Sequence, residues 1–377
     1  MSSYGKLTRS GRSGKLISYN MNWQQLQQTF RDKRVFLTGH TGFKGAWLLQ
    51  ILHTLGSDVK GYALAPEHDD DLYNQIDGDK LCYSSVIADL RDAHAVQGEL
   101  VRFSPHFVFH LAAQPLVRRG YQTPLKTFAV NAQGTAHVLE AVRGLPDACT
   151  AVMVTTDKVY ENPERGEPFT EDDKLGGHDP YSASKAAAEI IIDSYRRSFF
   201  NPESFAQHRK SIASARAGNV IGGGDFSEDR IVPDIVRAIR RLEPVRLRNP
   251  ASVRPWQHVL ESLYGYLMLA AKMTEDGAQF STAYNFGPDP KDVLPVETLT
   301  QIFLDRFGMG TYESIAEEGA PHEARLLTLD SSKASREIGW ISKLDARAAI
   351  EWTADWYADK RDARGKCSEQ IAQYFGA

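Results

Sequence analysis

The chain has 377 residues, of which 42% are hydrophobic and 24% are charged, and its formal net charge is -4. This length suggests about two domains, and the near balance of charges provides no cationic field that would hold a nucleic acid. No apolar stretch approaches the roughly 18 residues that a membrane-spanning helix needs, which predicts no membrane partner. The three cysteines are far apart and lack the spacing of a disulfide framework or a zinc site, which favours a reducing cytoplasm and predicts no metal.

The first 20 residues are rich in Ser, Gly, Lys and Arg and lack the apolar core of a signal peptide. We predict that residues 1–20 form a flexible N-terminal extension and that Met21 opens the folded part of the chain. A functional basic arm is the alternative for this segment.

Apolar runs that are typical of buried strands alternate with helical patterns from Lys33 to about Ala215. Strands are predicted at 35–38, 59–63, 84–88, 107–111, 151–155 and 211–215, and helices at 43–55, 93–103 and 134–143. This alternation predicts an α/β fold with a doubly wound parallel sheet of the Rossmann type. Glycines and prolines break the rhythm after Gly218. We therefore assign residues 21–217 to a dinucleotide-binding domain, with a return segment near 255–287, and residues 218–377 mainly to a smaller substrate-binding region.

A glycine-rich segment lies between the first predicted strand and the first predicted helix. Glycines at this place let backbone N–H groups approach a pyrophosphate at the positive end of the helix. The predicted cofactor-binding residues of this loop are Gly39, Thr41, Gly42, Phe43, Lys44 and Gly45. For Lys44, a phosphate partner and a solvated lysine are both open. No carboxylate follows the second strand to bind the ribose hydroxyls, so NAD and NADP both stay open and NAD is preferred.

Tyr181 and Lys185 are four residues apart at the start of a predicted helix, so they share one face of it. A cation near a tyrosine favours the phenolate, which then acts as a base toward an alcohol. In isolation such a pair is more often an exposed helix pair. Downstream of a dinucleotide-binding loop, it predicts the catalytic pair of an oxidoreductase-type site.

With this pair in place, the chain resembles the extended short-chain dehydrogenase/reductase family from about Lys33 to about Trp340. The resemblance also rests on the segments Asp89-Leu90-Arg91-Asp92, His110-Leu111-Ala112-Ala113-Gln114 and Asn131-Ala132-Gln133-Gly134-Thr135. It implies that the cofactor is also bound by Asp89, Leu90, Leu111, Ala112 and Ala113, together with Tyr181 and Lys185.

The segment Thr156-Asp157-Lys158 follows the fifth predicted strand. Thr156 matches the catalytic hydroxyl residue of the family. An acid followed by another charged residue resembles nucleotide-sugar 4,6-dehydratases, and the Asp-Lys pair resembles their CDP-glucose branch. The resemblance implies that Tyr181 acts in oxidation at C4, that Asp157 protonates the departing C6 hydroxyl, and that Lys158 removes the C5 proton. The alternative for Lys158 is an ion pair that orients Asp157, with Glu161 as a second candidate base.

Arginines are dense after residue 218 although the chain is acidic overall, which favours a local basic pocket for a nucleotide diphosphate over a solvated surface. The resemblance also assigns contacts with the substrate phosphates to Asn219 and the nucleotide diphosphate to Arg254. The predicted substrate-binding residues are Gln114, Asn219, Arg230, Arg246, Arg248, Arg254 and His322. No residue identifies cytosine physically, so that assignment rests on the resemblance.

The resemblance implies an NAD-dependent hydro-lyase that acts on CDP-glucose in the cytoplasm, as a homodimer or homotetramer, and supplies deoxysugars for the O-antigen of lipopolysaccharide. A dehydratase for another nucleotide sugar and a nucleotide-sugar 4-epimerase are the enzymatic alternatives. A nucleotide-sensing binding protein is the non-enzymatic alternative, although such a protein has no need of both Tyr181 and Lys185.

Overall fold

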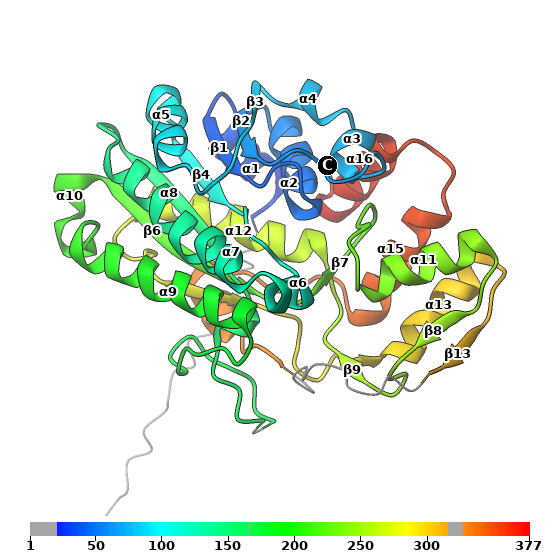
Figure 1. The fold of residues 1–377 in the computed structure, drawn as a ribbon. Helices are drawn as coiled ribbons and strands as arrows, with labels where there is room; N and C mark the ends of the chain where they lie inside the picture. Colours follow the sequence, from blue (N-terminus) through cyan, green and yellow to red (C-terminus); the bar gives the residue numbers. More distant parts are fainter. Residues whose placement is uncertain (1–20, 165, 316–326) are drawn as a thin grey trace, which may run out of the picture.

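In the computed structural model, which describes residues 21–164, 166–315 and 327–377, seven parallel strands form one sheet (Figure 1). These strands are β1 (Arg34–Thr38), β2 (Asp58–Ala63), β3 (Ser84–Ile87), β4 (Phe107–His110), β5 (Cys149–Val154), β6 (Lys210–Ala217) and β11 (Ala283–Phe286). Their spatial order is β11-β6-β5-β4-β1-β2-β3, and every neighbouring pair is parallel. The predicted α/β fold with a doubly wound parallel sheet is confirmed, and every predicted strand lies within two residues of its observed bounds.

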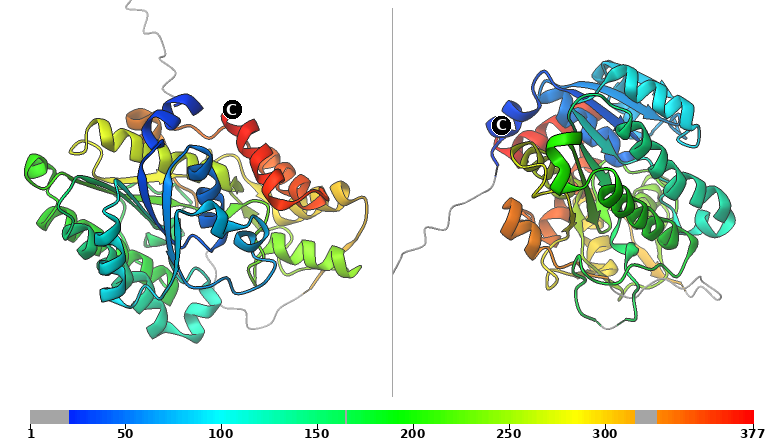
Figure 2. Two further views of the ribbon diagram at one scale, coloured as in Figure 1. Left: turned by 90° about the horizontal axis from the view of Figure 1, so that it is seen from above. Right: turned by 90° about the vertical axis from the view of Figure 1, so that its left-hand side faces the viewer.

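Helices cover both faces of this sheet, as Figure 2 shows. One face carries α5 (Ala93–Phe103), α8 (Gly134–Arg143) and α9 (Pro180–Ser198), and the other carries α1 (Trp23–Phe30), α2 (Phe43–Thr54), α12 (Val259–Glu275) and α16 (Ala363–Phe375). Successive residues of a strand point to opposite faces, so Val35 and Leu37 of β1 join one apolar core while Phe36 joins the other. Apolar residues on both faces of each strand explain why these strands read as continuous hydrophobic runs.

The sheet order reverses at β1, which has β2 on one side and β4 on the other. Connections from the carboxyl ends of two such strands diverge, and in open parallel sheets the crevice between them is where ligands bind. Here the crevice lies between the glycine loop (residues 39–45) after β1 and residues 111–114 after β4. The end of β5 lies beside it in the same sheet.

A smaller region packs beside the carboxyl ends of the strands, on the right in Figure 1. It contains α11 (Ile231–Arg241), α13 (Val296–Phe307), α14 (Ser332–Ile338) and α15 (Ala346–Ala358), and the two-stranded pairs β7 (Val220–Ile221) with β10 (Gln257–His258), β8 (Val245–Leu247) with β13 (Tyr312–Ser314), and β9 (Val253–Arg254) with β12 (Leu294–Pro295). The chain returns from this region to the sheet through α12 and β11. None of the described helices combines the length and the apolar character that crossing a membrane requires.

The remaining elements are short connections that position loops around the site. They are α3 (Leu72–Gln75), α4 (Gly78–Leu81), α6 (Val117–Gln122), α7 (Pro124–Phe128), α10 (Phe205–His208), the π-helical turn Ala129–Gln133, and the 3-10 turns Asp157–Val159 and Pro202–Ser204. The predicted extension at residues 1–20 lies outside the described residues.

Candidate active site

The glycine loop is shaped so tightly that two of its glycines admit no side chain. Gly39 has a φ of +75°, and a Cβ there would lie 2.7 Å from the backbone nitrogen of Ala112. A Cβ on Gly45 would lie 1.9 Å from the carbonyl oxygen of Gly39. Gly42 begins α2 without any side-chain cap, so the first N–H groups of that helix are left for another acceptor. This uncapped helix start in a side-chain-free cradle fits the pyrophosphate of a dinucleotide.

Other predicted cofactor residues hold the two sides of the crevice together. The hydroxyl of Thr41 donates to the carbonyl of Leu64, just beyond β2, at 2.8 Å. The hydroxyl of Thr38, at the end of β1, accepts the N–H groups of Leu111 and Ala112 at 3.1 Å each. Ala113 follows them and is half-buried. The backbone after β4 is therefore fixed against the strand that leads into the glycine loop.

Asp89 and Leu90, which the resemblance assigns to the adenine side, lie just beyond β3. The Asp89 carboxylate is 2.6 Å from the guanidinium of Arg91, whose hydrogen bonds lower the pKa of Asp89. Leu90 is buried against Gly134 at the start of α8, where a Cβ would come within 2.6 Å of the leucine side chain. Leu90 thus shapes the wall of the crevice, while the Asp89 side chain is already paired.

Lys44 is not a freely solvated lysine, and its predicted contact with a cofactor phosphate stays a prediction. Its side chain is half-buried, and its Nζ donates to the hydroxyl of Tyr266 on α12 at 3.0 Å. Burial and the charge of Arg230 lower the pKa of Lys44 to about 7, against an opposing effect of Asp157. Phe43 packs beside it toward the smaller region. The ammonium of Lys44 therefore faces the interior of the site from the cofactor loop.

Five predicted residues meet at the end of β5. The Thr156 hydroxyl donates to Asp157 Oδ1 at 2.8 Å, and it also forms a hydrogen bond with the Tyr181 hydroxyl. The Lys158 ammonium lies 3.7 Å from Asp157 Oδ1 and donates to Asn219 Oδ1 at 3.3 Å. Asp157 is buried, whereas the Lys158 side chain is 27% exposed. An acid, a potential base and a phenol therefore line one place where a small substrate can reach them.

Tyr181 and Lys185 are both buried near the start of α9. Burial raises the pKa of Tyr181 to about 12, although its hydrogen bond to Thr156 acts in the opposite direction. Lys185 donates to the carbonyl of Val154 at 3.0 Å, and burial lowers its pKa to about 8. Burial is the largest effect on the pKa of Tyr181, and the opposing effects of the Thr156 hydrogen bond and the charge of Arg230 are smaller.

Three arginines from separate segments pair with Asp225 and Asp229. Arg230 pairs with Asp225 at 3.1 Å. Arg118, on α6, lies 3.5 Å from Asp229, and Arg248 lies 3.6 Å from the same carboxylate. Sequence reasoning did not single out Arg118. Its only local signal is that it follows the strand-end segment after β4, and its approach to Arg248 is created by the tertiary fold.

Two predicted substrate residues, Arg246 and Arg254, differ in their exposure to solvent. Arg246 lies on β8 between the buried Val245 and Leu247, so its side chain points outward, where it is 73% exposed and pairs with Glu313. Arg254, on β9, is half-buried and donates to the carbonyl of Val253 at 2.9 Å. Strand alternation thus takes Arg246 away from the arginines that surround Asp229.

Gln114 is buried, and both ends of its side chain are used inside the protein. Its Nε2 donates to Thr127 at 3.0 Å, and its Oε1 accepts the N–H of Leu116 at 2.7 Å. These bonds shape the turn after β4 and leave the amide little capacity for a ligand. His322, the remaining predicted substrate residue, lies outside the described residues.

The sequence is similar to those of known proteins. The model of the GDP-mannose 4,6-dehydratase family matches residues 36–353. The chain is 41% identical over 353 residues to a CDP-glucose 4,6-dehydratase of Salmonella typhimurium, covering 92% of this chain and 98% of that relative. It is 28% identical over 345 residues to a dTDP-glucose 4,6-dehydratase of Streptomyces antibioticus, covering 87% of this chain and 93% of the other.

Solved structures of other proteins have a similar fold. The fold is similar to the crystal structure of a dTDP-glucose 4,6-dehydratase from Streptomyces venezuelae with NAD and TYD bound. The TM-score is 0.72 at 24% identity, and the match covers 87% of this chain and 98% of that chain. Because the family model spans most of the sequence and a relative is 41% identical almost from end to end, the chain belongs to the GDP-mannose 4,6-dehydratase family of extended short-chain dehydrogenases/reductases.

Proposed function

We propose that the chain is an NAD-dependent hydro-lyase that converts CDP-glucose into CDP-4-keto-6-deoxyglucose and water. One observation carries this proposal. The Thr156-Asp157-Lys158 segment meets Tyr181 and Asn219 at the end of β5, in a chain that is 41% identical to a CDP-glucose 4,6-dehydratase. An epimerase would need the phenol and the hydroxyl but not the acid and the base beside them.

The chemistry explains why these groups are needed together. The C5 proton of the sugar is not acidic until C4 is a ketone. The glycine loop and the Tyr181–Lys185 pair would hold NAD, which would supply a reversible hydride acceptor for C4 and C6, so that no net oxidation would occur. Tyr181 takes the proton of the C4 hydroxyl, which Thr156 orients by a hydrogen bond. Lys158, as its neutral amine, then removes the C5 proton while Asp157, as its carboxylic acid, gives a proton to the C6 oxygen, which departs as water. The Lys158 ammonium formed in this step returns a proton to C5 once C6 is reduced.

The two oxygens of Asp157 have different surroundings. Oδ1 accepts the Thr156 hydroxyl and faces the Lys158 ammonium. Oδ2 would lie 3.3 Å from a Cβ on Gly218, so the glycine leaves room in front of this oxygen. We assign Oδ2 as the atom that serves the C6 hydroxyl. Among the described residues, Lys158 has one close carboxylate, that of Asp157 at 3.7 Å, and a side-chain amide at 3.3 Å. Transfer of a proton from Lys158 to Asp157 would give both the neutral amine that accepts the C5 proton and the carboxylic acid that protonates the C6 oxygen.

The nucleotide diphosphate is assigned to the arginines near Asp229. Arg118 and Arg248 approach this carboxylate from the two parts of the molecule at 3.5 and 3.6 Å, which is longer than a strong ion pair. Arg230 lies beside them. A diphosphate offers more acceptor oxygens than one aspartate and suits the planar fork of a guanidinium. Substrate binding at this place would bridge the dinucleotide-binding part and the smaller region.

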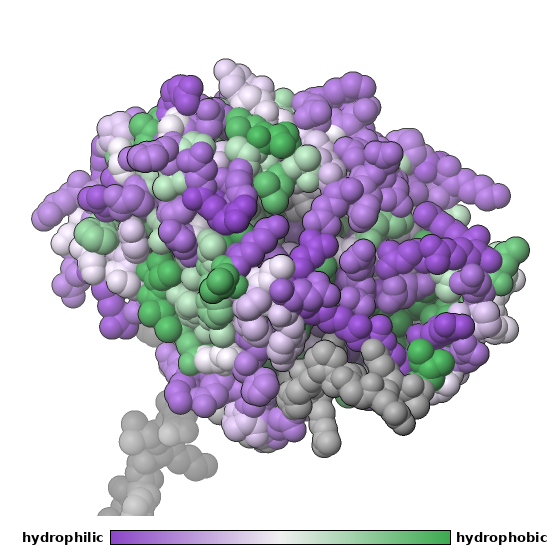
Figure 3. Space-filling model, in the orientation of Figure 1, coloured by the Kyte–Doolittle hydropathy of each residue, from purple (hydrophilic) through white to green (hydrophobic). Residues whose placement is uncertain are grey.

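An exposed apolar surface supports assembly into a homodimer or homotetramer. Leu125 on α7 is 86% exposed and Ile190 on α9 is 60% exposed, with Phe128 and Phe199 also on the surface. Figure 3 shows apolar surface over α7 and α9, to the left of its centre. We assign this surface to a second copy of the chain. A cytoplasmic location and a role in supplying deoxysugars for the O-antigen of lipopolysaccharide, both implied by the resemblance, belong to the same proposal.

The proposal is tested by incubating the purified chain with NAD and CDP-glucose, and in parallel with UDP-glucose and dTDP-glucose. Loss of one water with CDP-glucose alone, measured by mass spectrometry, is the expected result. The same loss with another nucleotide sugar would keep the reaction and reject the cytidine preference. An unchanged mass with inverted stereochemistry at C4 by NMR would identify an epimerase instead.

A further inference from the structure

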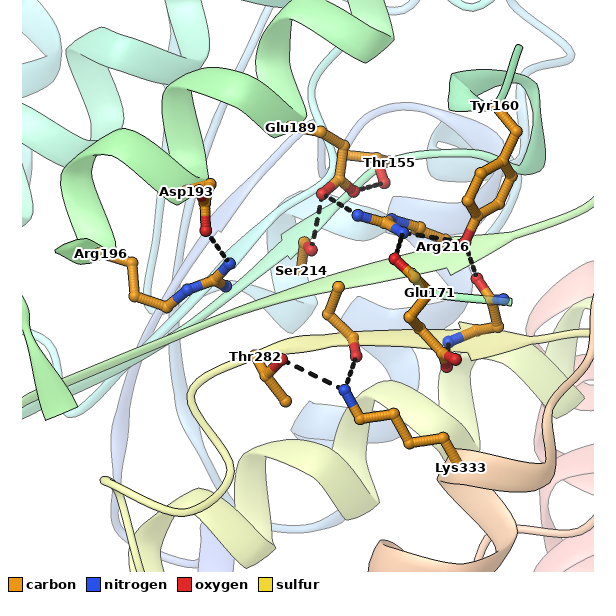
Figure 4. A network of polar contacts seen from close by, with 12 residues as sticks. Thr155, Tyr160, Glu171, Glu189, Asp193, Arg196, Ser214, Arg216, Thr282 and Lys333 are labelled. Carbon is orange, nitrogen blue, oxygen red and sulfur yellow. Dashed lines mark hydrogen bonds and ion pairs between the residues drawn. The ribbon is translucent and has the colours of Figure 1, made fainter. Parts of the chain in front are cut away.

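A buried ion pair joins α9 to β6 and contacts Thr155, the residue before Thr156 (Figure 4). Glu189 on α9 and Arg216 on β6 are 2.9 Å apart, with side chains 2% and 5% exposed. The Glu189 carboxylate also accepts the hydroxyls of Thr155 at 2.5 Å and Ser214 at 2.9 Å. Burial opposes a charge here, but Arg216 and these hydrogen bonds hold the pKa of Glu189 below its usual range. A charge pair so far from water is stable only with such satisfied geometry.

Arg216 extends the network to the segment that follows β5 and to β11. Its guanidinium donates to the Tyr160 hydroxyl at 2.9 Å and to the carbonyl of Glu171 at 3.1 Å. The Tyr160 hydroxyl in turn donates to Asn285 Oδ1 at 2.7 Å. Asn285 lies on β11, so α9 is linked through one carboxylate to the ends of β5, β6 and β11.

The bonds of this network fix how α9 lies against β5. Three consecutive residues of the chain at the end of β5 each contact a different residue of α9. The carbonyl of Val154 accepts Lys185, the hydroxyl of Thr155 donates to Glu189, and the hydroxyl of Thr156 bonds to that of Tyr181. The hydrogen bond between Thr155 and Glu189 lies between the contact of Val154 with Lys185 and the contact of Thr156 with Tyr181. It therefore holds the backbone from which both of these contacts are made.

We propose that Glu189, held by Arg216, is a positioning residue that fixes α9 in register with the end of β5, so that Tyr181 and Lys185 meet Thr156 and the cofactor crevice. This inference rests on the proposed function for its catalytic readout. Glu189 lies behind β5 and reaches no substrate, so its effect passes through Thr155 and Lys185.

Glu189 also acts on Lys185 through its charge. Burial lowers the pKa of Lys185, Glu189 raises it, and Lys44 on α2 lowers it. Of the other groups near this ammonium, His110 on β4 is kept neutral because burial and Lys185 lower its pKa to about 3, and burial raises the pKa of Tyr181. Glu189 is therefore the anion that opposes the loss of the Lys185 proton.

The first test is Glu189→Gln, which keeps the shape and an acceptor for Thr155 but removes the charge. Activity should fall as the pH rises through the pKa of Lys185, because the lysine then loses its proton. In Glu189→Gln this fall in activity should occur at a pH about one unit lower. Glu261→Gln is the matched control, since Glu261 is equally buried on α12 and accepts the N–H groups of Lys343 and Leu344 far from the site. Glu261→Gln should leave the pH of this fall in activity unchanged.

The second test separates position from charge. Thr155→Val removes the hydroxyl that Glu189 accepts and should lower kcat about tenfold or more, with a smaller change in KM, because the reacting groups are misplaced. Thr155→Ser keeps the hydroxyl and should restore kcat. Hydrogen–deuterium exchange of the unliganded chain should be faster at residues 154–158 in the valine variant than in the serine variant, and this readout needs no turnover.

The outcomes distinguish the two proposals. The positioning role would be overturned if activity fell at the same pH in Glu189→Gln as in the wild type, or if kcat were equal in the two Thr155 variants. If the single variant does not fold, Glu189→Met with Arg216→Met removes the pair without leaving a lone buried charge, and wild-type kcat in that double variant would also overturn it. If the wild type forms no product from any nucleotide sugar, the proposed function fails. Hydrogen–deuterium exchange of the two Thr155 variants still tests whether Glu189 fixes α9 against β5, because it needs no turnover.

Discussion

The glycine loop offers a test that separates its folding role from its binding role. In Gly45→Ala, the new Cβ would lie 1.9 Å from the Gly39 carbonyl oxygen and 2.8 Å from the Cα of His40. Both are backbone atoms that cannot rotate aside, so the loop and α2 must move apart by about 1 Å before even the tightest tolerated contact is reached. Overpacking of a dense site costs about 1–3 kcal/mol, and we expect the upper end of this range because backbone must shift.

Gly42→Ala is the matched substitution three residues earlier. The nearest atom to its Cβ is the Gly39 carbonyl oxygen at 3.5 Å, an ordinary contact. Gly42 also has a φ of -78°, which alanine adopts freely, so the cost of placing alanine at this helix start should stay below about 1 kcal/mol. The methyl group would nevertheless project at the uncapped start of α2, where the pyrophosphate is expected.

Urea unfolding of the unliganded variants and calorimetric titration with NAD provide the two measurements. Gly45→Ala should lose about 3 kcal/mol of unfolding free energy together with NAD affinity. Gly42→Ala should keep its stability and lose about tenfold or more in NAD affinity, equivalent to about 1.4 kcal/mol. Wild-type stability in Gly45→Ala would refute the steric reasoning, and unchanged NAD affinity in Gly42→Ala would remove the pyrophosphate from this loop.

Four further predictions concern other parts of the molecule. Tyr181→Phe should abolish NADH formation in a single turnover, and normal activity would contradict its assignment as the base at C4. Lys158→Ala should still form NADH but stop exchange of the C5 proton with deuterated water, and unchanged exchange would place the base elsewhere. Because burial lowers the pKa of Lys44 to about 7 from 10.5, the unfolded chain binds more protons than the folded chain between these values, so the unfolding free energy should rise with pH there. Lys44→Met should flatten this rise in urea titrations, and an identical slope would argue against a buried ammonium. Leu125→Asp combined with Ile190→Asp should give monomers by light scattering, and an unchanged oligomer would place the interface on another surface.

The sequence by itself determined the layered architecture. Strands of a parallel sheet are covered on both faces, so apolar runs such as 107–110 are visible without knowledge of their neighbours. Helix bounds were equally local. The helix Ala93–Phe103 begins after Asp92, whose carboxylate accepts the N–H of Ala95, and the helix Gly134–Arg143 ends at Gly144. The glycine loop and the Tyr181–Lys185 spacing are likewise properties of short segments, which is why the sequence could place them.

Only the tertiary structure decided which distant side chains meet. Arg118 approaches Arg248 because α6 and the end of β8 converge on Asp229, and Arg246 turns away because β8 buries its two neighbours. The tertiary structure also decided the charge states.

Burial raises the pKa of Tyr181, which the spacing of Tyr181 and Lys185 does not show. The carboxylate that supports Lys185 belongs to Glu189, which gains its partners from the end of β5 and from β6. Desolvation depends on everything packed around a group, and ion pairs depend on segments far apart in the chain. Neither quantity is contained in a local pattern of residues.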